Sequence, residues 1–182
     1  LGSGGSYLAE FIRDKNKLVN IHGNYRSTNR LIYKLLKDKN IKLHNCDLNN
    51  FSKFKSIINS IKPDLIFHLA SNADVRLSFD KPYDIINNNN LCTLNLLEIV
   101  RTLNIKPIIV LCSTSEVYGA VDSKLKINEN FRINPENPYS VSKTFQDLLA
   151  QNYQKNFGLK IIITRMFSYI NPRRLNLFAT HW

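Results

Sequence analysis

The sequence predicts an α/β fold in which a doubly wound parallel sheet carries helices on both faces. Strand-like and helix-like segments alternate along almost the whole chain of 182 residues, which is the pattern of parallel strands joined by crossover helices. The predicted strands are continuous apolar runs, as expected of strands buried on both faces. With 43% hydrophobic residues, the chain can bury one sizeable core. No apolar run approaches the roughly 20 residues that span a bilayer, so we expect no membrane partner.

In the first half of the chain, apolar spacing predicts three helices and three strands. The clearest helix covers residues 51–61, where apolar side chains recur at positions 51, 54, 57, 58 and 61 until Pro63 ends the pattern. The other predicted helices cover residues 6–14 and 30–37, and the predicted strands cover residues 18–22, 41–46 and 65–70.

In the second half, the same alternation continues with longer elements. Helices are predicted over residues 83–103 and 139–157, and strands over residues 107–113 and 160–166. Residues 120–138, rich in Asn and Pro, form a predicted loop of the length that usually carries function. Ligands of such sheets bind beyond the carboxyl ends of the strands, so the residues that follow each strand are the candidates for a site.

The net charge of +11, from 25 basic and 14 acidic residues, raises the question of a nucleic-acid partner. The basic residues are dispersed, without a basic block or an aromatic platform, and we therefore expect no nucleic-acid binding. The three cysteines, Cys46, Cys92 and Cys112, have no paired spacing, which indicates neither a disulfide framework nor a metal site. Reduced cysteines favour a cytoplasmic location.

A glycine cluster precedes the first predicted helix, with Gly2 and Gly5 three residues apart. Glycines at a helix N-terminus let backbone N–H groups approach a pyrophosphate, and the helix dipole favours negative charge there. The pattern indicates a dinucleotide site at these two residues, although a plain glycine turn has the same composition.

The segment after the strand at residues 18–22 bears on the type of dinucleotide. An NAD-binding protein normally places an acidic residue there, whereas this chain has Arg26 followed by Ser27. A cation and a hydroxyl suit the additional phosphate of NADP, so the sequence predicts NADP; a solvated arginine is the alternative. After the next strand, Asp47 and Leu48 are predicted to border the adenine, unless Asp47 caps the following helix.

Two polar segments carry the predicted chemistry. The strand at residues 107–113 leads into Thr114 and Glu116, while Tyr139 and Lys143 stand four residues apart at the start of a helix and so share one face. A lysine ammonium beside a tyrosine favours the phenolate and makes the tyrosine a usable base near neutral pH. The spacing also occurs in ordinary amphipathic helices, but its place after this strand favours the acid–base pair.

Together these segments resemble the extended short-chain dehydrogenase/reductase family of nucleotide-sugar enzymes, which have a Rossmann fold. The shared motifs are Gly5-Ser6-Tyr7-Leu8, Asp47-Leu48, Val75-Arg76-Leu77-Ser78-Phe79, Ser113-Thr114-Ser115-Glu116-Val117-Tyr118-Gly119, the Tyr139/Lys143 pair and Asn171-Pro172-Arg173-Arg174. Within that family the combination is similar to the GDP-mannose 4,6-dehydratases. The resemblance implies a protein about twice as long, with a C-terminal substrate domain. We therefore expect residues 1–182 to form an NADP-binding domain that lacks its first strand and that second domain, and to show no turnover alone.

The resemblance implies roles for individual residues. Tyr139 would take the proton of the sugar C4 hydroxyl while hydride passes to NADP, and Thr114 would bond the C4 oxygen. Glu116 would then take the C5 proton before water leaves from C6, and Lys143 would hold the nicotinamide ribose. Further contacts are implied for Leu69 and Ala70 with the cofactor and for Ser78, Ser168 and Arg173 with the substrate.

The resemblance implies GDP-mannose as the substrate, but one departure leaves the sugar nucleotide open. The Asn-His-Glu-Ser segment of the mannose enzymes is replaced by Ser168-Tyr169-Ile170-Asn171. A UDP-glucuronate decarboxylase, or another nucleotide-sugar epimerase/dehydratase, is the alternative, since Arg76 or Arg173 could bind a sugar carboxylate. A catalytically inactive NADP-binding protein is the second alternative. For the full-length protein we expect a homo-oligomer.

Overall fold

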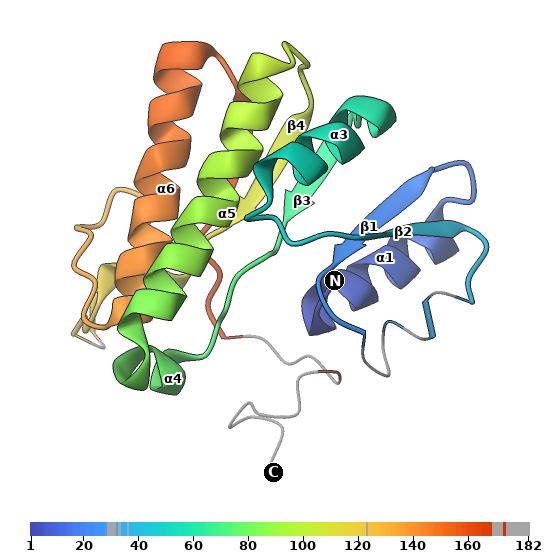
Figure 1. Ribbon diagram of the computed structural model, residues 1–182. Coiled ribbons are helices and arrows are strands. Elements are labelled where there is room, and N and C mark those ends of the chain that lie inside the picture. Colours follow the sequence, from blue (N-terminus) through green and yellow to red (C-terminus); the bar gives the residue numbers. More distant parts are fainter. Residues whose placement is uncertain (29–31, 33, 36, 123, 169–172, 174–182) are drawn as a thin grey trace. The chain divides into compact units, whose positions relative to one another are not determined.

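The computed structural model describes residues 1–182 with the exception of 29–31, 33, 36, 123, 169–172 and 174–182. The chain divides into two compact units, one formed by residues 1–57 with 168–182 and the other by residues 58–167. Most helices and strands of both units are labelled in Figure 1.

The first unit contains a helix followed by a pair of parallel strands. Helix α1 (Ser3–Lys15) leads to β1 (Ile21–Tyr25) and β2 (Ile41–Asn45), which pair residue for residue along their whole length. A small buried cluster joins these elements, formed by Ala9, Leu35 and Ile41 with Leu1, Ile21 and Leu43 packed against it.

The strand predicted over residues 18–22 was placed three residues too early, because β1 begins at Ile21. Asn16 Oδ1 accepts a hydrogen bond from the backbone N–H of Leu18 at 3.0 Å, and such side-chain bonds stabilise turns. Leu18 therefore lies in a turn after α1 and is 93% exposed.

Two helices of this unit also differ from their predicted ranges. Helix α1 begins at Ser3 rather than at residue 6, since Gly4 and Gly5 belong to its first turn. The helix predicted over residues 30–37 lies partly outside the described residues; within that range, Ile32 and Leu35 are buried.

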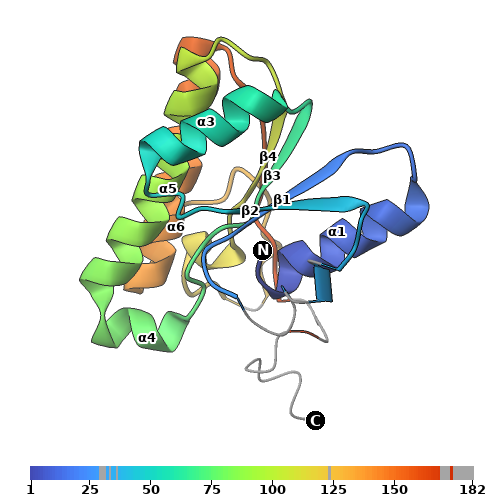
Figure 2. The same cartoon turned by 45° about the vertical axis from the view of Figure 1, so that its right-hand side comes forward.

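The second unit is a three-stranded parallel sheet of order β3-β4-β5 with two long helices. The strands are β3 (Leu65–His68), β4 (Ile108–Cys112) and β5 (Lys160–Thr164). The helices α5 (Pro82–Thr102) and α6 (Pro138–Phe157) run side by side in both views of the ribbon (Figures 1 and 2). All five elements overlap the ranges predicted for them, and α3 (Phe51–Ile61), which runs from the first unit into the second, has its predicted bounds.

The core of the second unit is formed by alternate residues of its strands and by the facing sides of α5 and α6. Ile109 and Leu111 of β4 are fully buried. Their neighbours in the sheet, Ile108 and Ile162, remain 41% and 53% exposed in this structure, although their apolar character fits strands covered on both faces. The largest fully buried apolar side chains of α5 are Ile85, Leu96, Leu97, Ile99 and Val100.

Two short elements of this unit escaped prediction. Helix α4 (Val75–Asp80) and the 3₁₀ helix η1 (Ser115–Tyr118) contain too few residues to show a helical period. The side chain of Asp74 caps α4 by accepting from the backbone N–H of Leu77 at 2.9 Å.

The predicted fold class is confirmed in its main features. Every strand pair among the described residues is parallel, in two sheets of order β1-β2 and β3-β4-β5, and helices accompany both. None of the helices in the described part of the chain is long and apolar enough to cross a membrane.

Candidate active site

The carboxyl end of β4 leads directly into two of the candidate catalytic residues. Thr114 has an extended backbone, and its Oγ1 accepts a hydrogen bond from the backbone N–H of Glu116 at 3.3 Å. The threonine thereby caps η1, the short helix that carries Glu116. Gly119 ends η1 at φ +68°, where a Cβ would lie 2.1 Å from the carbonyl oxygen of Asn134, so this turn requires glycine.

Tyr139 and Lys143 lie in the first turns of α6, four residues apart, as predicted. The helix begins with a capping box, in which the Asn137 side chain accepts from the Ser140 backbone N–H and Ser140 reciprocates. Both Tyr139 and Lys143 are buried, with 8% and 4% of their surface exposed. Their side chains are therefore held on one helical face and away from bulk water.

A hydrogen bond from Lys143 Nζ to the carbonyl oxygen of Cys112, at 2.5 Å, ties α6 to the end of β4. Burial lowers the pKa of Lys143 to about 8, because the charged form loses its hydration. The ammonium is still the main form at pH 7 and can favour a neighbouring phenolate, but it gives up its charge in mildly alkaline solution.

The Glu116 side chain is held by a residue at the start of α6. Its Oε2 accepts a hydrogen bond from Asn137 Nδ2 at 2.9 Å, and Asn137 is the residue that caps α6. The structure thus joins the β4–η1 segment, which carries Thr114 and Glu116, to the first turns of α6, which carry Tyr139 and Lys143. All four candidate catalytic residues belong to residues 58–167, the second unit.

A network of buried polar side chains between β3, α5 and α6, here called the polar seam, supports this arrangement. Asn89 of α5 pairs with both backbone groups of Asn72 and donates to Ser142 Oγ at 3.0 Å, and Ser142 donates to the Tyr139 carbonyl at 2.7 Å. The seam continues through His68, Thr93 and Gln146, with His68 Nε2 2.8 Å from Thr93 Oγ1 and Gln146 Nε2 2.6 Å from the same oxygen.

His68 is fully enclosed in the polar seam. Burial lowers its pKa to about 3, and the positive charge of Lys143 acts in the same direction. The imidazole is therefore neutral at physiological pH. It forms hydrogen bonds in the core and does not act as an acid.

A buried ion pair joins α6 to the residue that follows β5. Arg165 bonds both carboxylate oxygens of Asp147, at 2.8 and 3.1 Å, and also donates to Tyr118 Oη at 3.1 Å and to the Glu129 carbonyl at 2.7 Å. Burial acts to raise the pKa of Asp147, but the hydrogen bonds from Arg165 and Gln151 outweigh it and the pKa is lowered. This pair links α6, η1 and the long loop before α6.

The first unit holds most of the residues predicted to bind the cofactor. Gly2 is the N-cap of α1, while Gly5 is buried within its first turns, and the backbone N–H of Ser6 bonds the Gly2 carbonyl at 2.9 Å. The first N–H groups of a helix have no partner inside it. The N-terminus of α1 therefore offers the donors that a pyrophosphate needs.

Arg26 and Asp47 come from the ends of adjacent strands and approach to 4.0 Å between Nη1 and Oδ2. Ser27 is exposed and Leu48 half-buried. Asp47 does not cap α3, because Asn50 Oδ1 accepts from the backbone N–H of Lys53 at 3.0 Å. The second explanation of Asp47 is therefore wrong, whereas its contact with adenine remains a prediction.

The other residues predicted to contact cofactor or substrate differ in burial. Leu69 and Ala70 follow β3 and are half-buried, and Ser168 is exposed. Ser78 is fully buried in α4, with its hydroxyl donating to the Val75 carbonyl at 2.6 Å. Their contacts with cofactor and substrate remain predictions.

Arg173 was predicted to meet the substrate, and here its guanidinium is engaged by α1. It donates to Ser6 Oγ at 3.1 Å, pairs with Glu10, and lies 5.4 Å from the ring centre of Tyr7. A substrate would have to exchange these contacts for its own.

Sequence reasoning missed the residues that support the site, namely Asn137, Asn89, His68, Asp147 and Arg165. Asn137 alone left a local signal, because asparagine before a proline at the first helical position is typical of an N-cap. The others are defined by contacts between distant segments.

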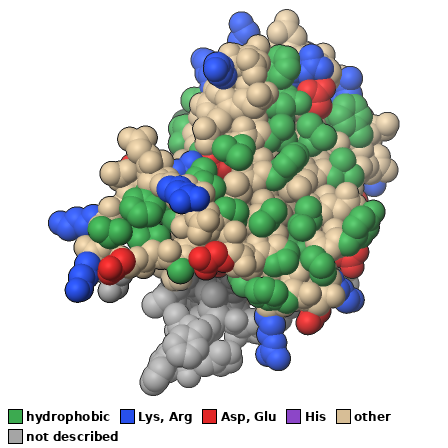
Figure 3. Space-filling view, turned by 90° about the vertical axis from the view of Figure 1, so that its left-hand side faces the viewer, with side chains coloured by type: hydrophobic (Ala, Val, Ile, Leu, Met, Phe, Trp, Pro, Cys, Tyr) green, Lys and Arg blue, Asp and Glu red, His purple; other side chains and the backbone are tan. Residues whose placement is uncertain are grey.

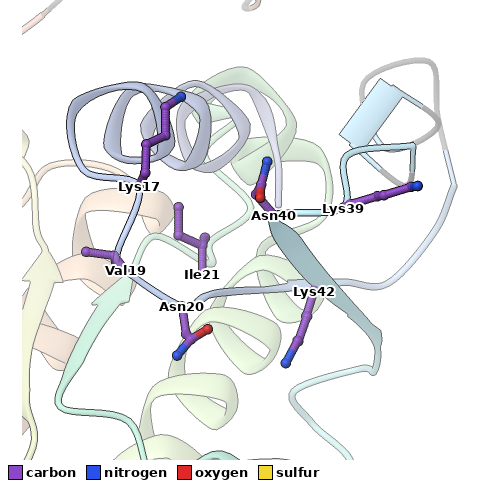
Figure 4. Close-up of a pocket in the computed structure, with 7 residues that line it drawn as sticks. All are labelled: Lys17, Val19, Asn20, Ile21, Lys39, Asn40 and Lys42. Atoms are coloured by element: carbon purple, nitrogen blue, oxygen red, sulfur yellow. The ribbon is translucent and has the colours of Figure 1, made fainter.

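A pocket of the first unit lies at the amino ends of β1 and β2 (Figure 4), whereas Arg26 and Asp47 follow their carboxyl ends. Its lining includes Lys17, Lys39 and Lys42. These three side chains point away from one another in Figure 4, so they do not converge on an anion. Ligands of parallel sheets bind at the opposite, carboxyl ends of the strands.

A Rossmann fold with a Tyr139/Lys143 pair at the start of α6, whose lysine is bonded to the end of β4, is typical of an extended short-chain dehydrogenase/reductase. The sequence model of one family, described as GDP-mannose 4,6 dehydratase, matches residues 1–181, and the chain belongs to this family.

Curated relatives agree with this assignment. The GDP-mannose 4,6-dehydratase of Vibrio cholerae is 33% identical over 98% of this chain and 50% of its own length. A UDP-glucuronate 4-epimerase of Thermodesulfobacterium geofontis is 30% identical over 92% of this chain and 53% of its own. The chain thus spans about half the length of the curated relatives that it matches.

Solved structures show the same fold. The dTDP-glucose 4,6-dehydratase of Bacillus anthracis, in complex with NAD, is 22% identical with a TM-score of 0.87, over 99% of this chain and 56% of that one. The UDP-glucuronic acid 4-epimerase of Bacillus cereus, in complex with UDP-glucuronic acid and NAD, is 26% identical with a TM-score of 0.86, over 98% and 58%.

Proposed function

We propose that this chain is the cofactor-binding and proton-transferring part of a nucleotide-sugar 4,6-dehydratase that acts on GDP-mannose. The observation that supports the proposal is a carboxylate, Glu116, bonded to the N-cap of the helix that carries the Tyr139/Lys143 pair. An epimerase that only oxidises and reduces C4 needs one base, whereas a dehydratase needs a further one for C5.

Tyr139 and Lys143 serve the first step. In the proposed reaction the phenolate of Tyr139 takes the proton of the C4 hydroxyl, and the Lys143 ammonium, fixed on the Cys112 carbonyl at 2.5 Å, favours that phenolate. Thr114 donates its hydroxyl to the C4 oxygen and orients the sugar. A bound nicotinamide supplies a reversible store for the C4 hydride, which returns to C6 at the end.

Glu116 serves the second step. The C4 ketone acidifies the neighbouring C5–H bond, and the Glu116 carboxylate takes that proton. The electron pair of the C5–H bond forms the double bond to C6, and the C6 hydroxyl leaves as water with the proton that Glu116 supplies. Tyr139 gives C5 the proton that it took from the C4 hydroxyl when hydride reaches C6, so the sugar loses one water in total and both side chains return to their starting forms.

NADP is part of the proposal. The N-terminus of α1 at Gly2 provides backbone donors for the pyrophosphate, and Arg26 with Ser27 offers a cation and a hydroxyl for the additional phosphate of NADP. Arg26 is largely exposed, with 66% of its side chain accessible, so a phosphate can approach its guanidinium from solvent. The solved relatives cited above were determined with NAD, which makes the choice of dinucleotide a direct test.

The alternative function is C4 epimerisation or decarboxylation of UDP-glucuronate. It is favoured by the 30% identity to a UDP-glucuronate 4-epimerase. Exposed Arg76 of α4 could then pair with the sugar carboxylate. A catalytically inactive NADP-binding protein is the remaining alternative.

Products distinguish these functions. The protein from the complete reading frame is incubated with GDP-mannose and UDP-glucuronate, and products are followed by mass spectrometry and carbon dioxide release. Loss of water from GDP-mannose supports the dehydratase, and a 4-epimer or carbon dioxide from UDP-glucuronate supports the alternative. Tight NADP binding without turnover of either sugar nucleotide supports the binding protein.

The 182-residue chain is expected to show no turnover alone, because it spans about half the length of its relatives. We further propose that the complete protein forms homo-oligomers in the cytoplasm. Hydrophobic side chains gather on the side where α6 lies (Figure 3), with Val141 45%, Phe145 41% and Leu148 50% exposed. Analytical ultracentrifugation of the complete protein tests the oligomeric state.

A further inference from the structure

Asn137 stands at the start of α6 and uses both ends of its carboxamide. Its Oδ1 accepts a hydrogen bond from the backbone N–H of Ser140 at 2.7 Å, and its Nδ2 donates to Glu116 Oε2 at 2.9 Å. Because a backbone N–H can only donate, the oxygen must face Ser140 and the amide nitrogen must face Glu116. The orientation of the amide is therefore determined by the helix cap itself.

The helix does not need an asparagine for its cap. Serine, threonine and aspartate cap helices about as well as asparagine. Among these residues asparagine alone adds a side-chain amide donor, which a carboxylate accepts. The choice of asparagine at position 137 therefore serves Glu116, which lies 21 residues earlier in the chain.

We propose that Asn137 is a positioning residue for Glu116, which it holds at a fixed place relative to Tyr139 in the first turn of the same helix. This inference rests on the proposed function. Tyr139 acts on the C4 hydroxyl and Glu116 on the adjacent C5, so the two bases must be spaced to fit neighbouring carbons. Asn137 engages Oε2, so Oε1 of the same carboxylate is the oxygen that the proposal gives the C5 proton.

Two substitutions separate the link from the cap. Asn137→Ser retains an N-cap but has no amide to reach Glu116. Asn137→Asp also retains an N-cap, but it places a second carboxylate against that of Glu116. Exposed Asn134, in the same loop, provides the matched control Asn134→Ser. Each variant of the complete protein is assayed with NADP and GDP-mannose for two separate steps: reduced nicotinamide formed at 340 nm, and exchange of C5–H with deuterium from solvent.

In Asn137→Ser, exchange at C5 is expected to fall by about tenfold to a hundredfold, the usual effect of a lost hydrogen bond to a charged group. Formation of reduced nicotinamide should stay within about twofold of the wild-type rate, since the cap and Tyr139 are kept. In Asn137→Asp, exchange should fall further, and its acidic limb should move to higher pH because two carboxylates repel. Asn134→Ser should change neither step.

A readout without turnover keeps this inference separate from the proposed function. The side-chain carboxyl carbon of Glu116, labelled with ¹³C and assigned by its loss in Glu116→Gln, should change its chemical shift in Asn137→Ser but not in Asn134→Ser. If the wild-type protein converts no sugar nucleotide, the proposed function fails and this resonance alone decides about Asn137. An unmoved resonance, unchanged C5 exchange, or an equal loss of both steps in Asn137→Ser would overturn the positioning role.

Discussion

The two units of the chain hold their functional candidates in opposite ways. In residues 58–167, Lys143 is 4% exposed and Asn89 fully buried, and each is bonded to partners on other elements. In residues 1–57, the side chains of Arg26 and Asp47 are 66% and 45% exposed, and a contact of 4.0 Å joins them. The second unit thus fixes Lys143 and Asn89 in its core, whereas the first presents Arg26 and Asp47 to solvent.

The difference follows from what each group is proposed to do. A base must meet one proton at one atom, which requires a fixed position and an environment that shifts its protonation. A phosphate can be attracted by a hydrated cation at longer range. Burial also makes each polar group costly to leave unpaired, so the second unit needs the polar seam and the Asp147–Arg165 pair.

The largest expected effect is on the rate of reaction, through a side chain of the second unit. Tyr139→Phe should lower kcat with GDP-mannose by about 100- to 10,000-fold, the usual contribution of a positioned acid–base group. The readout is product formation by the complete protein, with thermal unfolding measured alongside.

A second tyrosine of α6 provides the matched control. Tyr153 donates its hydroxyl to Glu98 at the far end of the helix, so Tyr153→Phe should leave kcat close to that of the wild type. Near-normal turnover in Tyr139→Phe would mean that the base lies elsewhere.

The next effect is on stability in the same unit. Asp147→Asn removes one partner of a buried ion pair and leaves Arg165 with an uncompensated charge, which should lower the free energy of unfolding by about 3–5 kcal/mol. Urea unfolding of the two proteins measures the loss.

A more exposed pair provides the comparison for this substitution. Glu98 and Arg101 lie one turn apart on α5, and Arg101→Gln should change the stability little because water screens that pair. Equal losses for Asp147→Asn and Arg101→Gln would contradict the view that burial makes the Asp147–Arg165 pair important.

Local patterns predicted the elements whose boundaries are local. The apolar stripe of α3 ends at Pro63, and its bounds agree with the prediction. The start of β1 was misplaced because an Asn16 side-chain bond turns the chain at Leu18, and apolar content alone does not reveal such a turn.

The same distinction applies to the site. Tyr139 and Lys143 lie four residues apart on one helix, so their spacing is visible in the sequence. Asn137 and Glu116 meet across 21 residues, and Asp147 and Arg165 across 18. Contacts of this kind depend on how β4, α6 and β5 pack, which no periodicity reports.

A pH dependence should mark the polar seam. The pKa of His68 is lowered from 6.5 to about 3 by burial, so below pH 6.5 the unfolded chain takes up a proton that the folded chain does not. Stability should therefore be complete above pH 6.5 and fall by about 1.4 kcal/mol per pH unit as the pH decreases toward 3.

His68→Gln isolates this contribution, because other titrating groups are the same in both proteins. Between pH 6.5 and 4.5, unfolding free energies of the variant should decline less steeply than those of the wild type. Parallel curves would mean that His68 is protonated in the folded protein and that the seam is not closed to water.

The smallest effect is expected on cofactor affinity, through a side chain of the first unit. Arg26→Ala should weaken NADP binding by about tenfold while NAD binding changes little, since a charge-assisted bond to a hydrated phosphate contributes modestly. Lys42→Ala removes the same charge at the other end of β1 and β2 and should leave both affinities unchanged.

Because Arg26 faces water, the preference for NADP should also decrease as the salt concentration increases. The effects of substituting buried residues should not depend on salt in this way. Equal affinity of the wild type for NAD and NADP would remove Arg26 from cofactor selection and leave it as a partner of Asp47.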